Sequence, residues 1–127
     1  MCKAGNAQRK AYDTPVVLFE FNKGVSFFMT VSAAIQILPK TETTEELIRI
    51  VDEVIAFIAK SGLNFYVGPF ETTIEGDSYD QIMQIVSDCS KIAIQAGCGE
   101  VSAYIKTVYK PEGGVLTIDE KITKHHH

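Results

Sequence analysis

Residues 63–77, LNFYVGPFETTIEGD, decide the fold because they contain two short strands with a break between them. Apolar and polar side chains alternate over 63–67 and again over 70–75, which is typical of strands with one buried face. Gly68-Pro69 separates the two runs, since proline cannot donate to a strand ladder. Hydroxyl and carboxylate side chains also gather here, close to the start of a helix, which is the composition of a binding site.

A helix is predicted on each side of this pair of strands. Before the pair, Thr43-Thr44-Glu45-Glu46 has the capping-box spacing, and Gly62 supplies the stop. After it, Asp77 or Ser78 can cap a second helix that ends before Gly97. The apolar stripes of the two helices are Leu47, Val51, Val54, Ile55 and Ile58, and then Ile82, Ile85, Val86, Cys89, Ala93 and Ala96.

Two outer strands complete the pattern. Residues 27–38 alternate clearly from Met29 onward until Pro39 ends the run, and 101–106 alternate again after the second helix. The order β-α-β-β-α-β predicts an α+β, ferredoxin-like fold, in which a four-stranded antiparallel sheet carries two helices on one face. The run 117–120, TIDE, has a further capping-box spacing and predicts a short C-terminal helix with an apolar side that docks elsewhere.

The alternation also predicts which side chains lie on the face without helices. This face is polar and aromatic, so it meets solvent, stacks on the sheet of another subunit or lines a ligand pocket. The predicted outward residues are Ser32, Gln36, Asn64, Tyr66, Thr73, Glu75, Ser102, Tyr104 and Lys106.

The chain is long enough for one domain, which we place at residues 27–124. Residues 1–26 form a predicted N-terminal extension with one candidate strand at 15–21, and a purine-rich coding run for residues 23–25 suggests that native translation begins at Met29. Residues 125–127 are three histidines directly after a lysine, which are interpreted as the remnant of a purification tag.

Composition excludes several classes of function. The formal net charge is −4 and the basic residues are scattered, so nucleic acid and anionic membranes are not expected partners. The three cysteines lack CxxC or Cys/His spacing, which argues against a disulfide framework and a zinc site and favours a reducing cytoplasm. No apolar run is long enough to span a bilayer, and we expect no signal peptide.

The residues favour binding over catalysis. An anion loop with an arginine, an RNA-binding aromatic motif and a metal-binding CxxC loop are all missing, and the only histidines are the three at the end. Glu71 and Glu75 could act as paired carboxylates, although such a pair is more often solvated. Glu75 could also stabilise the following helix by interacting with the helix dipole, or it could contact a ligand, and the sequence favours neither role over the other. Tyr66 and Tyr104 could stack on a cationic ring or pack between subunits.

Two segments carry a resemblance to a known family. The runs 31–39, VSAAIQILP, and 66–77, YVGPFETTIEGD, resemble the small thiamine-binding protein family, and 72–77 is the most specific element. The resemblance implies a cytoplasmic, ferredoxin-like subunit that forms homodimers and often homotetramers. It further implies binding of thiamine or its hydroxymethylpyrimidine moiety in thiamine salvage or transport, without catalysis and without a cofactor or metal.

The resemblance also implies the site. Ser32 in the first motif and Thr72, Thr73 and Glu75 in the second are the expected ligand contacts, and Gln36 and Tyr66 on the outward face complete the predicted ligand-binding set. One departure is Ala34, since many relatives carry an acid there. Two other readings stay open. One is an oligomeric structural or regulatory protein that binds no thiamine, and the other is a small-metabolite enzyme using Glu71, Glu75 and Lys106.

Overall fold

The computed structural model describes residues 29–125 and confirms the predicted ferredoxin-like order. The predicted N-terminal extension at 1–26, with its candidate strand, lies outside the described residues, as does most of the predicted tag, and the proposed translation start at Met29 stays a prediction. The elements are β1 (Val31–Pro39), α1 (Thr44–Ala59), β2 (Asn64–Val67), β3 (Thr72–Gly76), α2 (Tyr79–Gln95), β4 (Val101–Tyr109), α3 (Ile118–Ile122) and the 3-10 helix η1 (Thr123–His125).

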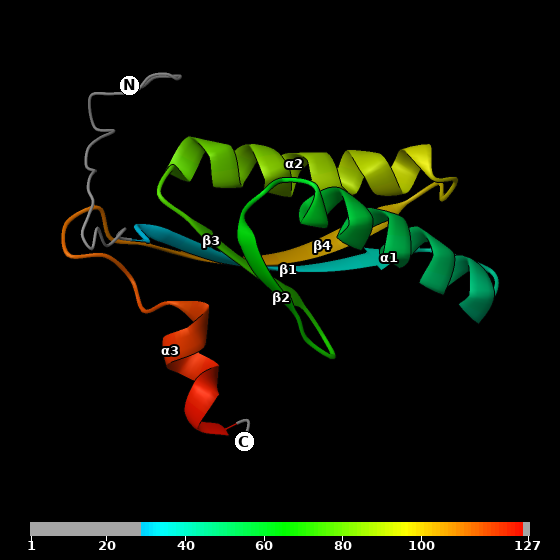
Figure 1. Cartoon of the computed structure of the whole chain (residues 1–127). Coiled ribbons are helices and arrows are strands. Elements are labelled where there is room, and N and C mark those ends of the chain that lie inside the picture. Colours follow the sequence, from blue (N-terminus) through cyan, green and yellow to red (C-terminus); the bar gives the residue numbers. More distant parts are fainter. Residues whose placement is uncertain (1–28, 126–127) are drawn as a thin grey trace.

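The four strands form one sheet in the order β2-β3-β1-β4, and every neighbouring pair is antiparallel. Helices α1 and α2 cover one face of this sheet, whereas α3 lies on the opposite side (Figure 1). The short helix therefore docks where the sequence predicts a face without helices. No helix in the described part of the chain is long and apolar enough to cross a membrane.

The core lies between the sheet and the two long helices. Val31, Ala33 and Ile35 project from β1 at alternate positions and are at most 3% exposed, and Ile74 of β3 is fully buried beside them. Burying one such branched side chain contributes roughly 1.5–3 kcal/mol. The helices contribute the predicted stripes, of which the buried members are Val54 and Ile58 of α1 and Ile82, Ile85, Val86, Cys89 and Ala93 of α2. Ile50 of α1 is buried as well, although the predicted stripe did not include it.

Both long helices begin at predicted caps. The Thr43 hydroxyl accepts a hydrogen bond from the Glu46 backbone N–H at 3.1 Å, and the Ser78 hydroxyl accepts one from the Gln81 N–H at 3.2 Å. Each bond satisfies a donor that has no partner within the helix. The Glu46 carboxylate is occupied elsewhere, because it binds Arg49.

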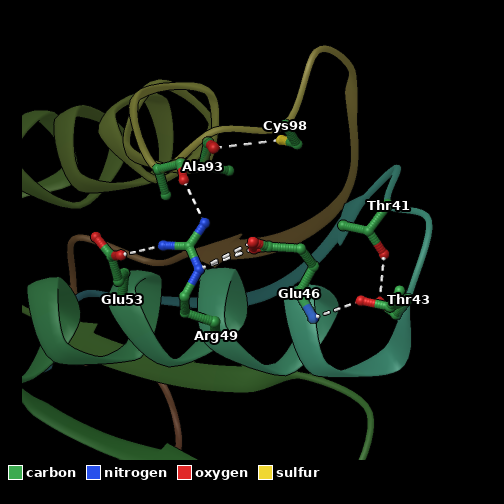
Figure 2. A network of polar contacts seen from close by, with 8 residues as sticks. Thr41, Thr43, Glu46, Arg49, Glu53, Ala93 and Cys98 are labelled. Atoms are coloured by element: carbon green, nitrogen blue, oxygen red, sulfur yellow. Dashed lines mark hydrogen bonds and ion pairs between the residues drawn. The ribbon is translucent and has the colours of Figure 1, made fainter.

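Arg49 connects α1 to the end of α2 (Figure 2). Its guanidinium donates to the carboxylates of Glu46 and Glu53, each at 2.8 Å, and to the backbone carbonyl of Ala96, which caps α2. The hydrogen bond to Glu46 is the main cause that raises the pKa of Arg49 above its ordinary value. This network holds the two helices together on their own side of the sheet, away from α3.

Candidate functional site

The strand register brings five of the six predicted site residues to one face. Ser32 of β1 lies opposite Glu75 of β3, and Thr73 of β3 lies opposite Tyr66 of β2. Gln36 is on the same face, opposite Tyr104 of β4. Since paired residues in an antiparallel sheet point to the same side, these side chains share the face that α1 and α2 leave uncovered.

Thr72 is the exception among the predicted residues. It pairs with Ile35 and Val67, so its side chain belongs to the helix-covered face, and it is 6% exposed. Neighbouring residues of a strand point to opposite faces, and Thr72 and Thr73 therefore cannot both reach one site from the same side. The structure separates Thr72 from the other five, and a ligand contact there stays a prediction.

A pocket of about 330 Å³ lies between the sheet and α3. Its floor contains Ser32 and Ala34, two small side chains in the first half of β1, while Tyr66 and Thr73 lie on the adjoining strands. A volume of this size is at the lower end of the range for small-molecule sites. The other residues that line the pocket are Glu71, Lys106, Thr107, Val108, Ile118, Lys121 and Ile122.

Glu75 holds the wall of this pocket without lining it. Its side chain is 3% exposed, and its two oxygens accept hydrogen bonds from different elements. The Asn64 side-chain amide donates to Oε2 at 2.6 Å, and the backbone N–H of Ile118 donates to Oε1 at 2.7 Å. Because Ile118 is the first residue of α3, the carboxylate satisfies a free donor at that helix start and fixes α3 over the sheet.

Further contacts keep α3 in place. Ile118 is 5% exposed, and the Thr117–Glu120 capping box is complete, with both reciprocal hydrogen bonds formed. Upstream, the backbone N–H of Val115 donates to the carbonyl of Met29 at 2.7 Å. Gly113 and Gly114 have φ of 87° and 77°, which glycine adopts at little cost and which turn the chain back from β4.

Three charged side chains line the pocket. Lys106 Nζ is 3.2 Å from Glu71 Oε2, so these two charges offset each other across the sheet. Lys121 Nζ lies 3.5 Å from the Ser32 hydroxyl. Within residues 29–125, no group of three or more His, Cys, Asp or Glu side chains is placed to hold a metal ion.

The predicted site residues and the residues that line the pocket are not the same set. Gln36 was predicted and shares the face but does not line the pocket, and six lining residues were not predicted. Val108 was missed because β4 runs to Tyr109, three residues beyond the predicted strand, although the alternation of Tyr104, Lys106 and Val108 carries the signal. The other lining residues absent from the sequence-based candidates are Ala34, Thr107, Ile118, Lys121 and Ile122.

Comparisons with known proteins agree with the architecture. The model of a family described as thiamine-binding protein matches residues 33–126. A UPF0045 protein of Clostridium perfringens is 43% identical over 96 residues, which cover 76% of this chain and 97% of that protein.

Solved structures give the same picture. A domain of unknown function, DUF77, from Bacillus cereus is 34% identical with a TM-score of 0.68, covering 77% of this chain and 91% of that one. A Thermotoga maritima protein, provisionally described as a thiamine biosynthesis/salvage protein, is 30% identical with a TM-score of 0.66, covering 76% and 98% of the two chains. The family model matches most of the chain, and the Clostridium perfringens relative is 43% identical over nearly its whole length. These two matches show that the chain belongs to the thiamine-binding protein family.

Proposed function

We propose that this protein binds thiamine or its hydroxymethylpyrimidine moiety without catalysing a reaction, and that it serves thiamine salvage or transport in the cytoplasm. The observation that carries the proposal is the pocket of about 330 Å³ between the sheet and α3. Membership of the thiamine-binding protein family and the description of the Thermotoga maritima relative support the choice of ligand.

The chemistry of the lining suits an aminopyrimidine. The Glu71 carboxylate can accept a hydrogen bond from the exocyclic amino group, and the Thr73 hydroxyl can donate to a ring nitrogen. Tyr66 offers an aromatic surface, and Ile118 and Ile122 of α3 offer an apolar wall for the ring.

The placement of the carboxylates supports binding rather than catalysis. The enzyme alternative needs Glu71, Glu75 and Lys106 as reactive groups. Glu75 is buried with both oxygens accepting hydrogen bonds from the protein, and Glu71 is paired with Lys106. Thiamine and hydroxymethylpyrimidine incubated with the protein should therefore be recovered unchanged, which NMR of the mixture can measure.

Calorimetric titration tests the proposed ligand directly. Ligand-free full-length protein is titrated with thiamine and with hydroxymethylpyrimidine, and thermal unfolding is recorded with and without each compound. We expect saturable binding near one site per subunit and a raised melting temperature, because a ligand that binds only the folded state stabilises it. Absence of both heat and thermal shift would favour the oligomeric structural or regulatory alternative.

A specific observation also favours self-association. Leu38, Tyr66, Tyr104 and Val108 all belong to the uncovered face and are 36–67% exposed. Apolar and aromatic groups gathered on one sheet face are typical of interaction surfaces. We therefore propose that two copies stack through this face as a homodimer, with homotetramers built from such dimers.

A further inference from the structure

Of the two lysines that line the pocket, one has an ion-pair partner within the described part of the chain and the other does not. Glu71 and Lys106 form an ion pair with 3.2 Å between the nearest nitrogen and oxygen, so together they contribute little net charge. Lys121 also lines the pocket, and it makes no ion pair with any residue in the range 29–125. Lys121 is therefore the one lining charge without an ion-pair partner among the described residues, and the buried Glu75 carboxylate behind the wall is held by Asn64 and Ile118.

Lys121 is directed toward the floor of the pocket. Its Nζ donates to the Ser32 hydroxyl at 3.5 Å, and Ser32 is only 4% exposed. An ammonium group has three donors and Ser32 fills one of them, so the others are available to an acceptor that enters the pocket. A hydroxyl on the floor and an ammonium above it are a suitable pair for the oxygens of an anion.

The pocket has two chemically distinct ends. Ser32 and Lys121 mark one end, whereas Tyr66 and Glu71 lie toward the other. Ala34 pairs with Thr73 on one side and with Lys106 on the other. It lies two residues after Ser32 on β1, which corresponds to about 7 Å along the strand. A ligand with a flat ring at one end and an anion at the other matches this division.

We propose that the pocket selects a phosphate monoester of the ligand over the unphosphorylated compound, with Lys121 Nζ and the Ser32 hydroxyl holding the phosphate. This inference rests on the proposed function, since it specifies which chemical form of thiamine or hydroxymethylpyrimidine binds. A phosphate group can form a charge-assisted contact with the Lys121 ammonium, which the alcohol group of the unphosphorylated compound cannot form.

The test compares five compounds against the full-length protein by calorimetry. These are hydroxymethylpyrimidine, its phosphate monoester, thiamine, thiamine monophosphate and inorganic phosphate, each titrated at low and at high salt. We expect each ester to bind at least about tenfold more tightly than its parent alcohol, equivalent to about 1.4 kcal/mol. This ratio should shrink at high salt because the pocket is open to solvent and its charges are screened.

Two charge-removing variants locate the effect. Lys121→Gln should lower the ester-to-alcohol affinity ratio toward one. Lys91→Gln removes the same charge from an exposed position of α2 on the other side of the sheet, and it should leave the ratio unchanged. If Lys121→Gln lowers the melting temperature, Lys121→Arg restores the charge and should restore the ratio.

The outcomes separate this inference from the proposed function. Alcohols that bind as tightly as their esters, or equal ratios in Lys121→Gln and Lys91→Gln, would overturn the phosphate preference while leaving thiamine binding intact. Inorganic phosphate that binds as tightly as the esters would overturn it in favour of a general anion site. Binding of none of the five compounds would overturn both proposals.

Discussion

At Glu75, one carboxylate joins two elements that lie far apart in the sequence. Its local context predicts either a ligand acceptor or an acid at the start of α2. The folded chain instead gives its oxygens to Asn64, 11 residues upstream, and to the N–H of Ile118, 43 residues downstream. Periodicity along a strand shows which face a side chain occupies, but it contains no information about a partner so distant, and the anchoring role was therefore not predicted.

We expect Glu75→Gln to destabilise the fold by about 1–3 kcal/mol, because one of its two side-chain oxygens becomes an NH₂ donor that faces another buried donor. Glu71→Gln is the matched control. Its partner Lys106 is 73% exposed, and loss of so exposed an ion pair should cost less than about 1 kcal/mol. Urea unfolding of both variants measures the difference, and equal stabilities would contradict the anchoring role.

Cys89 allows a second prediction at a single residue. It is fully buried, as its place in the predicted apolar stripe indicates, and burial raises the pKa of its thiol from 9.0 to about 12, with a smaller contribution from the charge of Asp88. Above pH 9 the unfolded chain releases this proton while the folded chain keeps it. The stability linked to Cys89 is therefore complete below pH 9.0 and is lost as the pH rises toward 12.

Compared with Cys89→Ala, the wild-type protein should lose about 1.4 kcal/mol of unfolding free energy per pH unit in this window. Other groups titrate there too, but they cancel in the difference between the two proteins. Denaturant unfolding of both, at pH values on either side of 9.0, gives that difference. A difference independent of pH would show that the thiol is not held neutral.

At the scale of elements, the strength of each local signal decides what the sequence could predict. Caps at Thr43 and Ser78 and the strict alternation of β1 are local properties, so these elements were predicted within a few residues of their ends. The five residues of α3 were predicted as a helix from their capping box. Two apolar residues, Ile118 and Ile122, are too few to say which surface the helix covers, and its position over the pocket emerged only from the fold.

The turn between β2 and β3 provides a test at this scale. The Gly68 N–H donates to the Glu71 carbonyl at 2.9 Å, and a Cβ added at Gly68 would lie only 2.9 Å from the same oxygen. We expect Gly68→Ala to cost about 1–3 kcal/mol through this crowding and to weaken ligand binding, because Glu71 lines the pocket.

Gly99→Ala is the control for this substitution. A Cβ at Gly99 meets no atom within 4 Å, and the change should alter stability by no more than about 0.5 kcal/mol. Thermal unfolding and the thiamine titration, applied to both variants, provide the two readouts. A Gly68→Ala protein as stable as Gly99→Ala would show that the turn relaxes without loss.

For the whole molecule, strand alternation predicted one side of the site and not the other. Ser32, Tyr66 and Thr73 were assigned to the correct face from alternation alone, and all three line the pocket. The wall opposite them comes from α3, whose lining residues are more than forty positions away in the sequence from Thr73. A pocket between distant segments depends on tertiary packing, which is why Lys121 was not among the predicted residues.

The uncovered face provides the prediction for assembly. Tyr104 is 67% exposed on β4 and lies outside the pocket lining, so Tyr104→Lys should leave the monomer folded. Within a stacked interface the new ammonium group would lose its contact with water, and the mass in solution should fall toward that of a monomer. Light scattering after size-exclusion chromatography measures this mass at several protein concentrations.

Ile94→Lys is the control for assembly, because it places a lysine at a 45% exposed position of α2 on the helix-covered side. That variant should keep the mass of the wild type. A wild-type protein that is monomeric at every concentration, or a Tyr104→Lys protein that is still dimeric, would exclude stacking through this face.

The docking of α3 also bears on how such a protein can diversify. Within residues 29–125, the main core cluster contains no residue after Ile105, whereas three lining residues belong to α3. Substitutions in this last segment can therefore retune what the pocket accepts while the sheet and its two long helices keep their packing. In a family of such subunits, ligand preference can change through substitution of a few residues in α3. Exchange of this C-terminal segment between relatives would then change which ligand is bound.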